Sequence, residues 1–268
     1  MATLETKNDK LKAIQVLRQQ RPGWGQNLIL AGIRGSDAHG TKLPEDHPRH
    51  TDDVDTFGVS VQSIRWYLTL EANGKNRQTW ETSGERYDHL IYDVRKFFSL
   101  LAKGNPNVHS WLWADPSDQV LVTPPGKVIL DNRERFLSKA CFSALVGYAK
   151  AQMHKMDRKR YQGYQGAKRK KIVDEVGYDV KHAAHCIRLL NMGIELATTG
   201  IMSTRRPRDE AAMLMEVKAG EWPFRKVETL SLELYRRFKE CEPLSTLPEK
   251  PDMRDVNDLL VTVVEMAQ

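Results

Sequence analysis

Two aspartates near the start of the chain follow a glycine-serine pair, and these residue types together can bind a metal ion and a phosphate. Gly35-Ser36 follows one apolar run after a single arginine, and Asp53-Val54-Asp55 opens the next. Because successive side chains of a strand point to opposite faces, Asp53 and Asp55 are expected on the same face. Two carboxylates there offer the hard oxygen ligands that Mg²⁺ takes alongside phosphate oxygens. The glycine lets the backbone approach a phosphate, and the serine hydroxyl and helix N-terminal amides can donate hydrogen bonds to it.

A third carboxylate on a neighbouring strand would complete a two-metal site, which positions an attacking oxygen and stabilises a departing pyrophosphate. The run from Asp88 to Asp93 is expected to be that strand. These two acids are five positions apart, so a regular strand places them on opposite faces, and the spacing leaves both as candidates. It also leaves a plain alternative, in which Asp53 and Asp55 form a solvated turn between two strands.

The segments around these residues predict a mixture of strands and helices. Short apolar runs predict strands, and apolar residues at helical spacing predict helices. The polar segment 41–52 contains Pro44 and Pro48, so it is expected to be a loop. Gly104-Asn105-Pro106 is a strong stop signal for a helix. The expected strands are 28–33, 54–61, 66–70 and 88–93, and the expected helices are 9–20 and 94–103.

The second half of the chain predicts helices throughout. Asp179 fits an N-cap and Gly200 fits the residue that ends a long helix between them. A boundary is expected near Pro124-Pro125-Gly126, where strand-like segments give way to helices. The predicted fold class is therefore α+β, with a mixed-sheet domain over residues 1–125 and an all-α domain over 126–268. The expected helices are 133–155, 179–199, 209–219, 227–241 and 253–266.

The helix expected after Asp179 carries one polar stripe on an otherwise apolar surface. Lys181, His185 and Arg188 fall at positions i, i+4 and i+7, so they share one face of the helix. Two interpretations fit this stripe. It faces a cleft and contacts the phosphates of a nucleotide, or it is an ordinary solvent-facing stripe.

The positive charge of the chain is concentrated in one segment. The chain has 41 Lys and Arg against 35 Asp and Glu, a net charge of +6, yet residues 150–171 carry nine Lys and Arg and one acid. Cationic groups neutralise phosphates, and the interleaved Tyr161 and Tyr164 can stack on bases, so this segment fits an RNA partner. A solvated basic loop is the alternative. The candidate RNA ligands are Lys159, Arg160, Lys168, Arg169, Lys170 and Lys171.

The overall composition excludes several classes of protein. Hydrophobic residues make up 40% and charged residues 28% of the 268, which rules out collagen, low-complexity chains and charge-dominated disorder. No apolar run approaches the ~18–20 residues of a membrane span, and residues 1–21 lack an apolar signal region. The three cysteines form no CxxC pair, so a zinc site is not expected. We expect a reduced, cytoplasmic location and no membrane partner.

Gly35-Ser36 and Asp53-Val54-Asp55 together resemble the signature of the DNA polymerase β-type nucleotidyltransferase superfamily. The fuller runs from Gly35 to Thr41 and from Asp53 to Val59 resemble one branch more closely, the predicted RNA-repair nucleotidyltransferases of bacteria and phages. Two further segments fit this branch, and the resemblance spans residues 27–220. These segments are Tyr92–Phe98 leading to Gly104–Asn107, and Lys181–Gly193.

The resemblance implies a nucleotidyltransferase-like N-terminal domain and a role for each residue of the motifs. Asp53 and Asp55 would bind Mg²⁺ or Mn²⁺, and Gly35 and Ser36 would hold the triphosphate of an NTP. The residues that would contact the nucleotide from the long helix are Lys181, His185 and Arg188.

The resemblance also favours one of the two candidates for the third carboxylate. Asp88 matches the acidic position of the branch better than Asp93, and it would bind metal or take the proton of the acceptor hydroxyl. The sequence departs from the branch in two ways. Sixteen residues separate Ser36 from Asp53, a few more than expected, and Asp37 and His39 replace residues that are commonly basic and aromatic.

The reaction that the resemblance implies is transfer of NMP from an NTP to the 3′ hydroxyl of an RNA, a tRNA or damaged RNA among them, with release of pyrophosphate. Two alternatives stay open. The acceptor could be a small molecule or a protein hydroxyl, which would not need the basic segment. The chain could instead be a catalytically silent RNA-binding protein, although the intact Gly35, Ser36, Asp53 and Asp55 argue against that.

Overall fold

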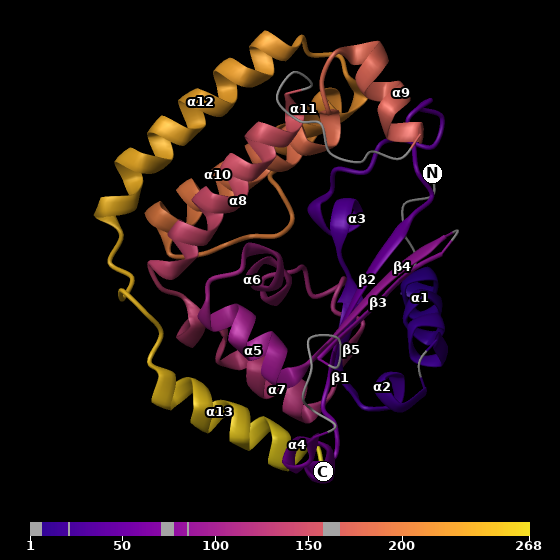
Figure 1. The fold of residues 1–268 in the computed structure, drawn as a ribbon, viewed down its shortest axis with the longest axis vertical. Helices are drawn as coiled ribbons and strands as arrows, with labels where there is room; N and C mark the ends of the chain where they lie inside the picture. The colour runs from indigo at the N-terminus through magenta and orange to yellow at the C-terminus, as the bar shows by residue number, and fades with distance from the viewer. Residues whose placement is uncertain (1–6, 21, 71–77, 85, 158–166) are drawn as a thin grey trace.

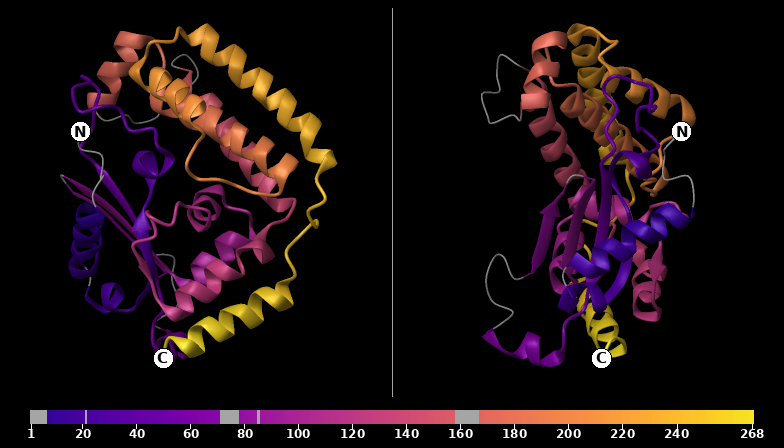
Figure 2. Two further views of the ribbon diagram at one scale, coloured as in Figure 1. Left: turned by 180° about the vertical axis from the view of Figure 1, so that it is seen from behind. Right: turned by 90° about the vertical axis from the view of Figure 1, so that its right-hand side faces the viewer.

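The computed structural model describes residues 7–20, 22–70, 78–84, 86–157 and 167–268. Figure 1 shows a sheet with its covering helices in one half of the molecule and a group of long helices in the other. The edge-on view in Figure 2 shows the helical half above the sheet half. This arrangement confirms the predicted α+β fold class. None of the described helices combines the length and apolar composition needed to cross a bilayer.

Five strands form the sheet within the described residues: β1 (Leu28–Ile33), β2 (Val54–Ser60), β3 (Thr79–Ser83), β4 (Tyr87–Asp93) and β5 (Leu121–Val122). Their order is β3-β4-β2-β1-β5. β2 and β4 run parallel, and the other neighbouring pairs are antiparallel. β1, β2 and β4 confirm predicted strands, whereas β3 and β5 were not predicted.

Helices make up most of the remainder of both halves. In the sheet half these are α1 (Lys7–Gln20), α2 (Pro22–Gln26), α3 (Gly35–His39), α4 (Ile64–Leu68), α5 (Val94–Ala102), α6 (Pro106–Leu112), α7 (Pro124–Asp131) and, from far along the chain, α13 (Met253–Met266). The helical half holds α8 (Ala140–Met156), α9 (Ala167–Val176), α10 (Val180–Thr199), α11 (Arg208–Ala219) and α12 (Phe224–Cys241).

The two faces of the sheet bury different partners. On one face Leu17 of α1 packs with Ala31 and Ile91. On the other face Phe57 and Leu90 pack in a larger core with α5, α6, α7 and α13. Because side chains alternate along a strand, the adjacent Leu90 and Ile91 of β4 belong to different cores.

Two segments of the sheet half differ from the sequence prediction. The sequence predicts a strand at 66–70, but α4 is a helix, because the Ser63 side chain caps it by accepting from the Trp66 amide at 3.3 Å. The predicted stop signal does end α5, but it also starts α6. There the Asn105 side chain accepts from the Asn107 amide at 3.0 Å, which makes Asn105 an N-cap.

Helix α10 lies at the centre of the helical half and packs against α8, α11 and α12. Its two ends confirm the predicted N-cap at Asp179 and the predicted end at Gly200. The Asp179 side chain accepts from the backbone amides of Lys181 and His182, and Gly200 ends the helix in the left-handed conformation with φ of 73°. The helix predicted over 133–155 begins only at α8, since its first residues form a separate 3₁₀ turn.

The hydrophobic cores of the sheet half and the helical half do not divide where the sequence suggests a domain boundary. The sequence predicts a helical domain over all of 126–268, but α7 and α13 belong to the core of the sheet half. Ile129 of α7 and Val256, Leu259 and Val263 of α13 are buried there. Figure 1 shows α13 returning beneath α5 and α7. The packing thus assigns these two helices to the sheet half, because α7 packs on β1 and α13 packs on α5 and α7.

Candidate active site

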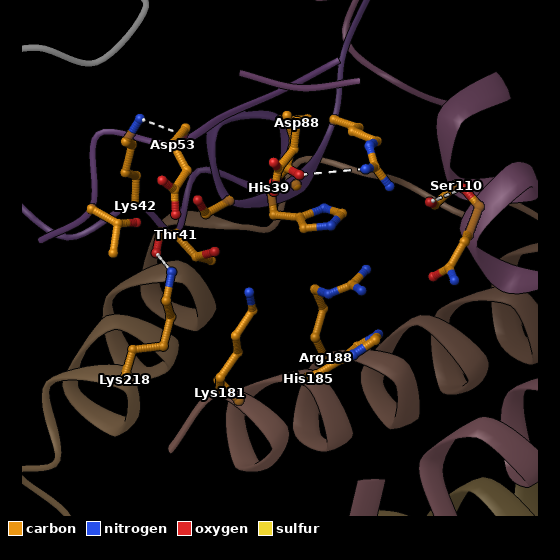
Figure 3. A pocket seen from close by; sticks show the side chains of 18 of the residues that line it. His39, Thr41, Lys42, Asp53, Asp88, Ser110, Lys181, His185, Arg188 and Lys218 are labelled. Carbon is orange, nitrogen blue, oxygen red and sulfur yellow. Dashed lines mark hydrogen bonds and ion pairs between the residues drawn. The ribbon is translucent and has the colours of Figure 1, made fainter. Parts of the chain in front are cut away.

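A cavity of about 580 Å³ lies between the two halves of the molecule. Strands β2 and β4 form one wall, which we call the sheet wall, and helices α10 and α11 form the facing helical wall (Figure 3). The loop 41–53 and helix α6 supply further lining. The cavity therefore collects residues from distant parts of the sequence.

Asp55 and Asp88 lie side by side on the sheet wall. β2 and β4 pair in parallel with Asp55 opposite Asp88, and residues paired in register on neighbouring strands point to the same face. Asp53 also lines the cavity, but it lies just before β2 rather than in it. Both aspartates of the motif therefore line the same cavity, although only Asp55 lies within the strand.

Asp93, the other candidate for the third carboxylate, lies at the opposite end of β4 and does not line the cavity. Its buried side chain accepts hydrogen bonds from the Arg95 amide at 3.0 Å and the Tyr67 hydroxyl at 2.8 Å, so it caps α5. Burial raises the pKa of Asp93. Of the two candidates, only Asp88 lies with the other carboxylates.

The glycine-serine pair lies directly against the carboxylate of Asp55. Gly35 has a φ of +73°, in the left-handed region that favours glycine. A Cβ atom added at Gly35 would collide with the Asp55 carboxylate. Ser36 follows in the first turn of α3 and also lines the cavity. Glycine is therefore required twice here, for its backbone conformation and for the close approach to the acid.

The donor chemistry of the sheet wall fits a divalent metal whose coordination is completed by substrate. Within the described residues, no group of three or more His, Cys, Asp or Glu side chains is arranged to hold an ion by itself. Asp55 also faces a cation, since the Arg34 guanidinium is 3.5 Å from its carboxylate. Mg²⁺ commonly takes one or two protein carboxylates and fills its other positions with water and phosphate oxygens. The carboxylates that line this cavity can supply that number of ligands.

The helical wall presents positive charge to these carboxylates. Lys181, His185 and Arg188 of α10 all line the cavity, so this polar stripe faces the sheet wall (Figure 3). Lys42 and Lys218, which belong to no predicted motif, line the same cavity. The structure thus adds these two lysines to the predicted set, and Arg34 and Arg49 line the cavity as well.

Lys42 and Lys218 are held at defined positions. The Lys42 ammonium lies 3.2 Å from the Asp37 carboxylate and donates to the Asp53 carbonyl at 3.2 Å. The Lys218 ammonium donates to the Thr41 carbonyl at 2.6 Å. Burial, with a smaller contribution from neighbouring lysine charges, lowers the pKa of Lys218 to about 8. The charge of Lys218 therefore changes close to neutral pH.

A sequence signal for Lys218 exists in the periodicity of α11. Ala211 and Leu214 are buried, and Lys218 follows them at i+7 and i+4. Lys218 thus lies on the inward face of the helix, where a lysine is unusual unless it has a partner. Lys42 has no comparable signal, because it lies in an irregular loop.

Two neutral histidines and a buried arginine complete the lining. Burial lowers the pKa of His39 and of His185 well below the ordinary value, so both are uncharged near pH 7. Arg188 is 8% exposed, and its guanidinium donates to the Met192 Sδ at 3.1 Å. Burial lowers the pKa of Arg188 to about 10, so this side chain keeps its charge.

The polar loop 41–53, whose length departs from the family pattern, bridges the two halves. Arg49 lies 3.5 Å from the Glu175 carboxylate in α9 and donates to the Ala219 carbonyl at the end of α11. Other residues of the loop line the cavity. The extra length therefore forms part of the site instead of a peripheral insertion.

The basic segment 150–171 contributes less free charge than the sequence suggests. The Arg169 guanidinium is held by the Asp179 carboxylate at 2.5 and 3.0 Å, so it is paired inside the fold instead of being free for RNA. Lys170 and Lys171 are exposed. The candidates that lie outside the described residues are Lys159, Arg160 and the side chain of Lys168.

Comparison with known proteins finds relatives of this chain. A 135-residue stretch is 30% identical to an uncharacterized 38.9 kDa protein in the nrdC-mobD intergenic region of Enterobacteria phage T4. The match covers 47% of this chain and 38% of the phage protein, so the chain spans less than half the length of that relative. The model of the RNA repair pathway DNA polymerase beta family, RlaP, matches residues 4–262. Since this match extends over nearly the whole chain, the chain belongs to the RNA repair pathway DNA polymerase beta family, a family of polymerase β-type nucleotidyltransferases.

Proposed function

We propose that this protein transfers a nucleoside monophosphate from an NTP to the 3′ hydroxyl of an RNA, such as a tRNA or a damaged RNA, with Mg²⁺ or Mn²⁺ bound. One observation supports this most. Three aspartates and a glycine-serine turn line the same cavity as three lysines. A reaction that expels pyrophosphate needs anionic metal ligands at the reacting phosphorus and cations on the leaving group.

The NTP lies with its triphosphate between the glycine-serine turn and the lysines. Gly35 lets the backbone approach the phosphates, and the Ser36 hydroxyl donates to them. Lys42, Lys181 and Lys218 neutralise the charge that develops on the leaving pyrophosphate.

The carboxylates of Asp53, Asp55 and Asp88 would hold the divalent metal together with phosphate oxygens of the NTP, and the bound metal would neutralise charge on the phosphates. The acceptor oxygen forms a bond to the α-phosphorus while the bond from that phosphorus to the α–β bridging oxygen breaks. Pyrophosphate leaves with the electron pair of that bond. Asp88 takes the proton of the acceptor hydroxyl, or it stays a metal ligand while the proton passes to solvent.

An RNA acceptor is supported by the family, whose description places it in RNA repair. Lys170 and Lys171 are exposed on α9, and they offer cations for an RNA backbone outside the cavity. A small-molecule or protein acceptor has no comparable observation in its favour.

The test is a transfer assay with each α-labelled NTP supplied separately. Purified protein and Mg²⁺ are incubated with total RNA, with RNA whose 3′ diol has been oxidised by periodate, and with small-molecule and protein acceptors. We expect label on intact RNA, none on oxidised RNA, and loss of transfer in Asp53→Ala. The matched control is Asp258→Ala, an exposed acid on α13. Absence of transfer, or transfer unaffected by Asp53→Ala, would overturn the proposal.

A further inference from the structure

In the part of the chain that the structure describes, Arg188 is a buried cation without an anionic partner. Its side chain is 8% exposed, and its hydrogen bond within the fold goes to the thioether sulfur of Met192. Among the described residues, no carboxylate lies within ion-pair distance of its guanidinium. Glu210, whose charge acts on Arg188, is held by Arg206 through two hydrogen bonds of 2.9 Å.

An unpaired charge inside a protein is unfavourable, because water has been removed and nothing replaces it. Arg188 does not avoid this by losing its proton, since its pKa stays at about 10. The side chain points into the cavity instead of into the core (Figure 3). The missing partner is therefore expected to be a ligand that enters the cavity.

Arg188 lies apart from the three lysines. Lys181 and Arg188 are seven positions apart on α10, which separates their backbones by about 10 Å along the helix. The charge of Lys181 and that of Lys42 act on Lys218, so the lysines form one group. Figure 3 shows this group on one side of Asp88 and Arg188 on the other.

The geometry of phosphoryl transfer assigns a partner to each side. The attacking and leaving oxygens lie roughly in line, on opposite sides of the reacting phosphorus. If the lysines hold the leaving pyrophosphate, Arg188 lies on the side from which the acceptor attacks. We propose that Arg188 binds a phosphate of the acceptor strand, the internucleotide phosphate nearest the attacking 3′ hydroxyl. This inference rests on the proposed function, and it replaces the expected contact of Arg188 with the nucleotide.

The groups beside Arg188 suit a phosphate. The guanidinium presents parallel N–H groups that match two phosphate oxygens. The Nε2 atom of His185, one turn away on the same helix, is buried and lacks a hydrogen-bond partner among the described residues. His185 can donate to the same phosphate when its proton is on Nε2. Both His185 and His39 are neutral, so neither competes with Arg188 for the anion.

The consequence is a requirement on the acceptor. A hydroxyl compound without a nearby phosphate would leave the Arg188 charge buried and unpaired in the transition state, and such mismatches discriminate strongly. The site therefore selects a nucleic-acid end over a neutral small molecule.

The experiment compares two oligoribonucleotides that differ at one phosphate. One is unmodified, and in the other the last internucleotide phosphate is an uncharged methylphosphonate. For wild type we expect kcat/KM for the modified strand to be lower by roughly 10- to 100-fold. Arg188→Met should show a similar loss with the unmodified strand, no discrimination between the strands, and an unchanged KM for NTP. Arg188→Lys should recover part of the discrimination, and Arg237→Met, on an exposed arginine of α12, should behave as wild type.

Two results would overturn the inference. The first is a raised KM for NTP in Arg188→Met while the two strands are still discriminated, which would assign Arg188 to the nucleotide. The second is a clear fall in the melting temperature of Arg188→Met, because removal of an unpaired charge should not destabilise the fold.

If wild type transfers to no acceptor, the proposed function fails, and binding of the same strands tests Arg188 separately. Fluorescence anisotropy should then show weaker binding of the methylphosphonate strand to wild type and equal binding of both strands to Arg188→Met. Equal binding of both strands to wild type would overturn the inference.

Discussion

The two walls of the cavity carry opposite charges and are built in different ways. On the sheet wall, backbone pairing places Asp55 beside Asp88, and the contact with Gly35 leaves no spare room. On the helical wall, long side chains such as Lys181 and Lys218 reach in from two helices. Short side chains on a hydrogen-bonded sheet tolerate little displacement, whereas flexible lysines can adjust. We therefore expect changes in the sheet wall to lower kcat and changes at the lysines of the helical wall to raise the KM for NTP.

The largest effect should come from Asp55→Asn, which we expect to lower kcat by about a thousand-fold. The amide has the same shape but no charge, so it cannot replace a carboxylate that holds the metal. The measurement is steady-state kinetics with NTP varied, and Asp258→Asn is the matched control. A raised KM for NTP with normal kcat would break the distinction between the walls.

Gly35→Ala should be next, with kcat lower by roughly a hundred-fold through displacement of the Asp55 carboxylate. The left-handed backbone should add a stability cost of about 1–3 kcal/mol. Gly200→Ala separates the two effects, because Gly200 also has a φ of +73° but has no atom within 4 Å of an added Cβ. Urea unfolding should show a stability loss in both variants and kinetics a loss only in Gly35→Ala. Equal kcat in both would show that the contact does not matter.

The pH dependence of NTP binding should report the charge of Lys218 on the helical wall. Burial lowers the pKa of Lys218 to about 8. Its side chain is therefore positively charged below pH 8 and loses that charge as the pH rises through 8. We expect the KM for NTP to rise several-fold between pH 7 and pH 9. Lys218→Met should have a raised KM at pH 7 and a flatter profile, whereas Lys250→Met, an exposed control, should follow wild type. The charged groups that face Lys218 are Lys181, Asp37, Lys42 and Asp55.

The smallest effect should come from outside the cavity, where Lys170 and Lys171 are exposed. Reversal of both to Glu should raise the KM for RNA a few-fold and leave NTP binding unchanged. The slope of the logarithm of the RNA-binding constant against the logarithm of salt concentration should fall by about two. Arg236→Glu with Arg237→Glu is the matched reversal on α12. An equal loss from that pair would indicate a general charge effect.

Local patterns predicted most helices and three strands, because caps and apolar periodicity act over a few residues. Asp179 and Gly200 end α10 as their residue types require. The strand predicted over 66–70 is wrong, and this too has a local cause. The apolar run does not alternate, and the Ser63 side chain caps a helix there. The short strands β3 and β5 have little local signal and depend on pairing with their neighbours.

The choice between Asp88 and Asp93 shows what local patterns cannot settle. Spacing alone leaves both, because strand register depends on the pairing of β2 with β4 across a long connection. The structure separates them by two contacts that the sequence does not display: Asp88 pairs with Asp55, and Asp93 caps α5. Lys42 is another such case, since its place follows from the packing of a loop.

The return of α13 to the sheet half has a consequence for synthesis of the chain. Val256, Leu259 and Val263 complete the core beneath the strands, and the Gln268 side chain accepts from the Ile64 amide at 2.9 Å. The core of the helical half closes with residues that are made earlier, the furthest well-buried one being Phe238. A nascent chain therefore finishes its helical half first, while the strands that carry Asp55 and Asp88 wait for a helix made some 170 residues later. The core behind the acidic wall is therefore completed after the helical wall, so, under the proposed function, a growing chain would lack a complete site for RNA near the ribosome.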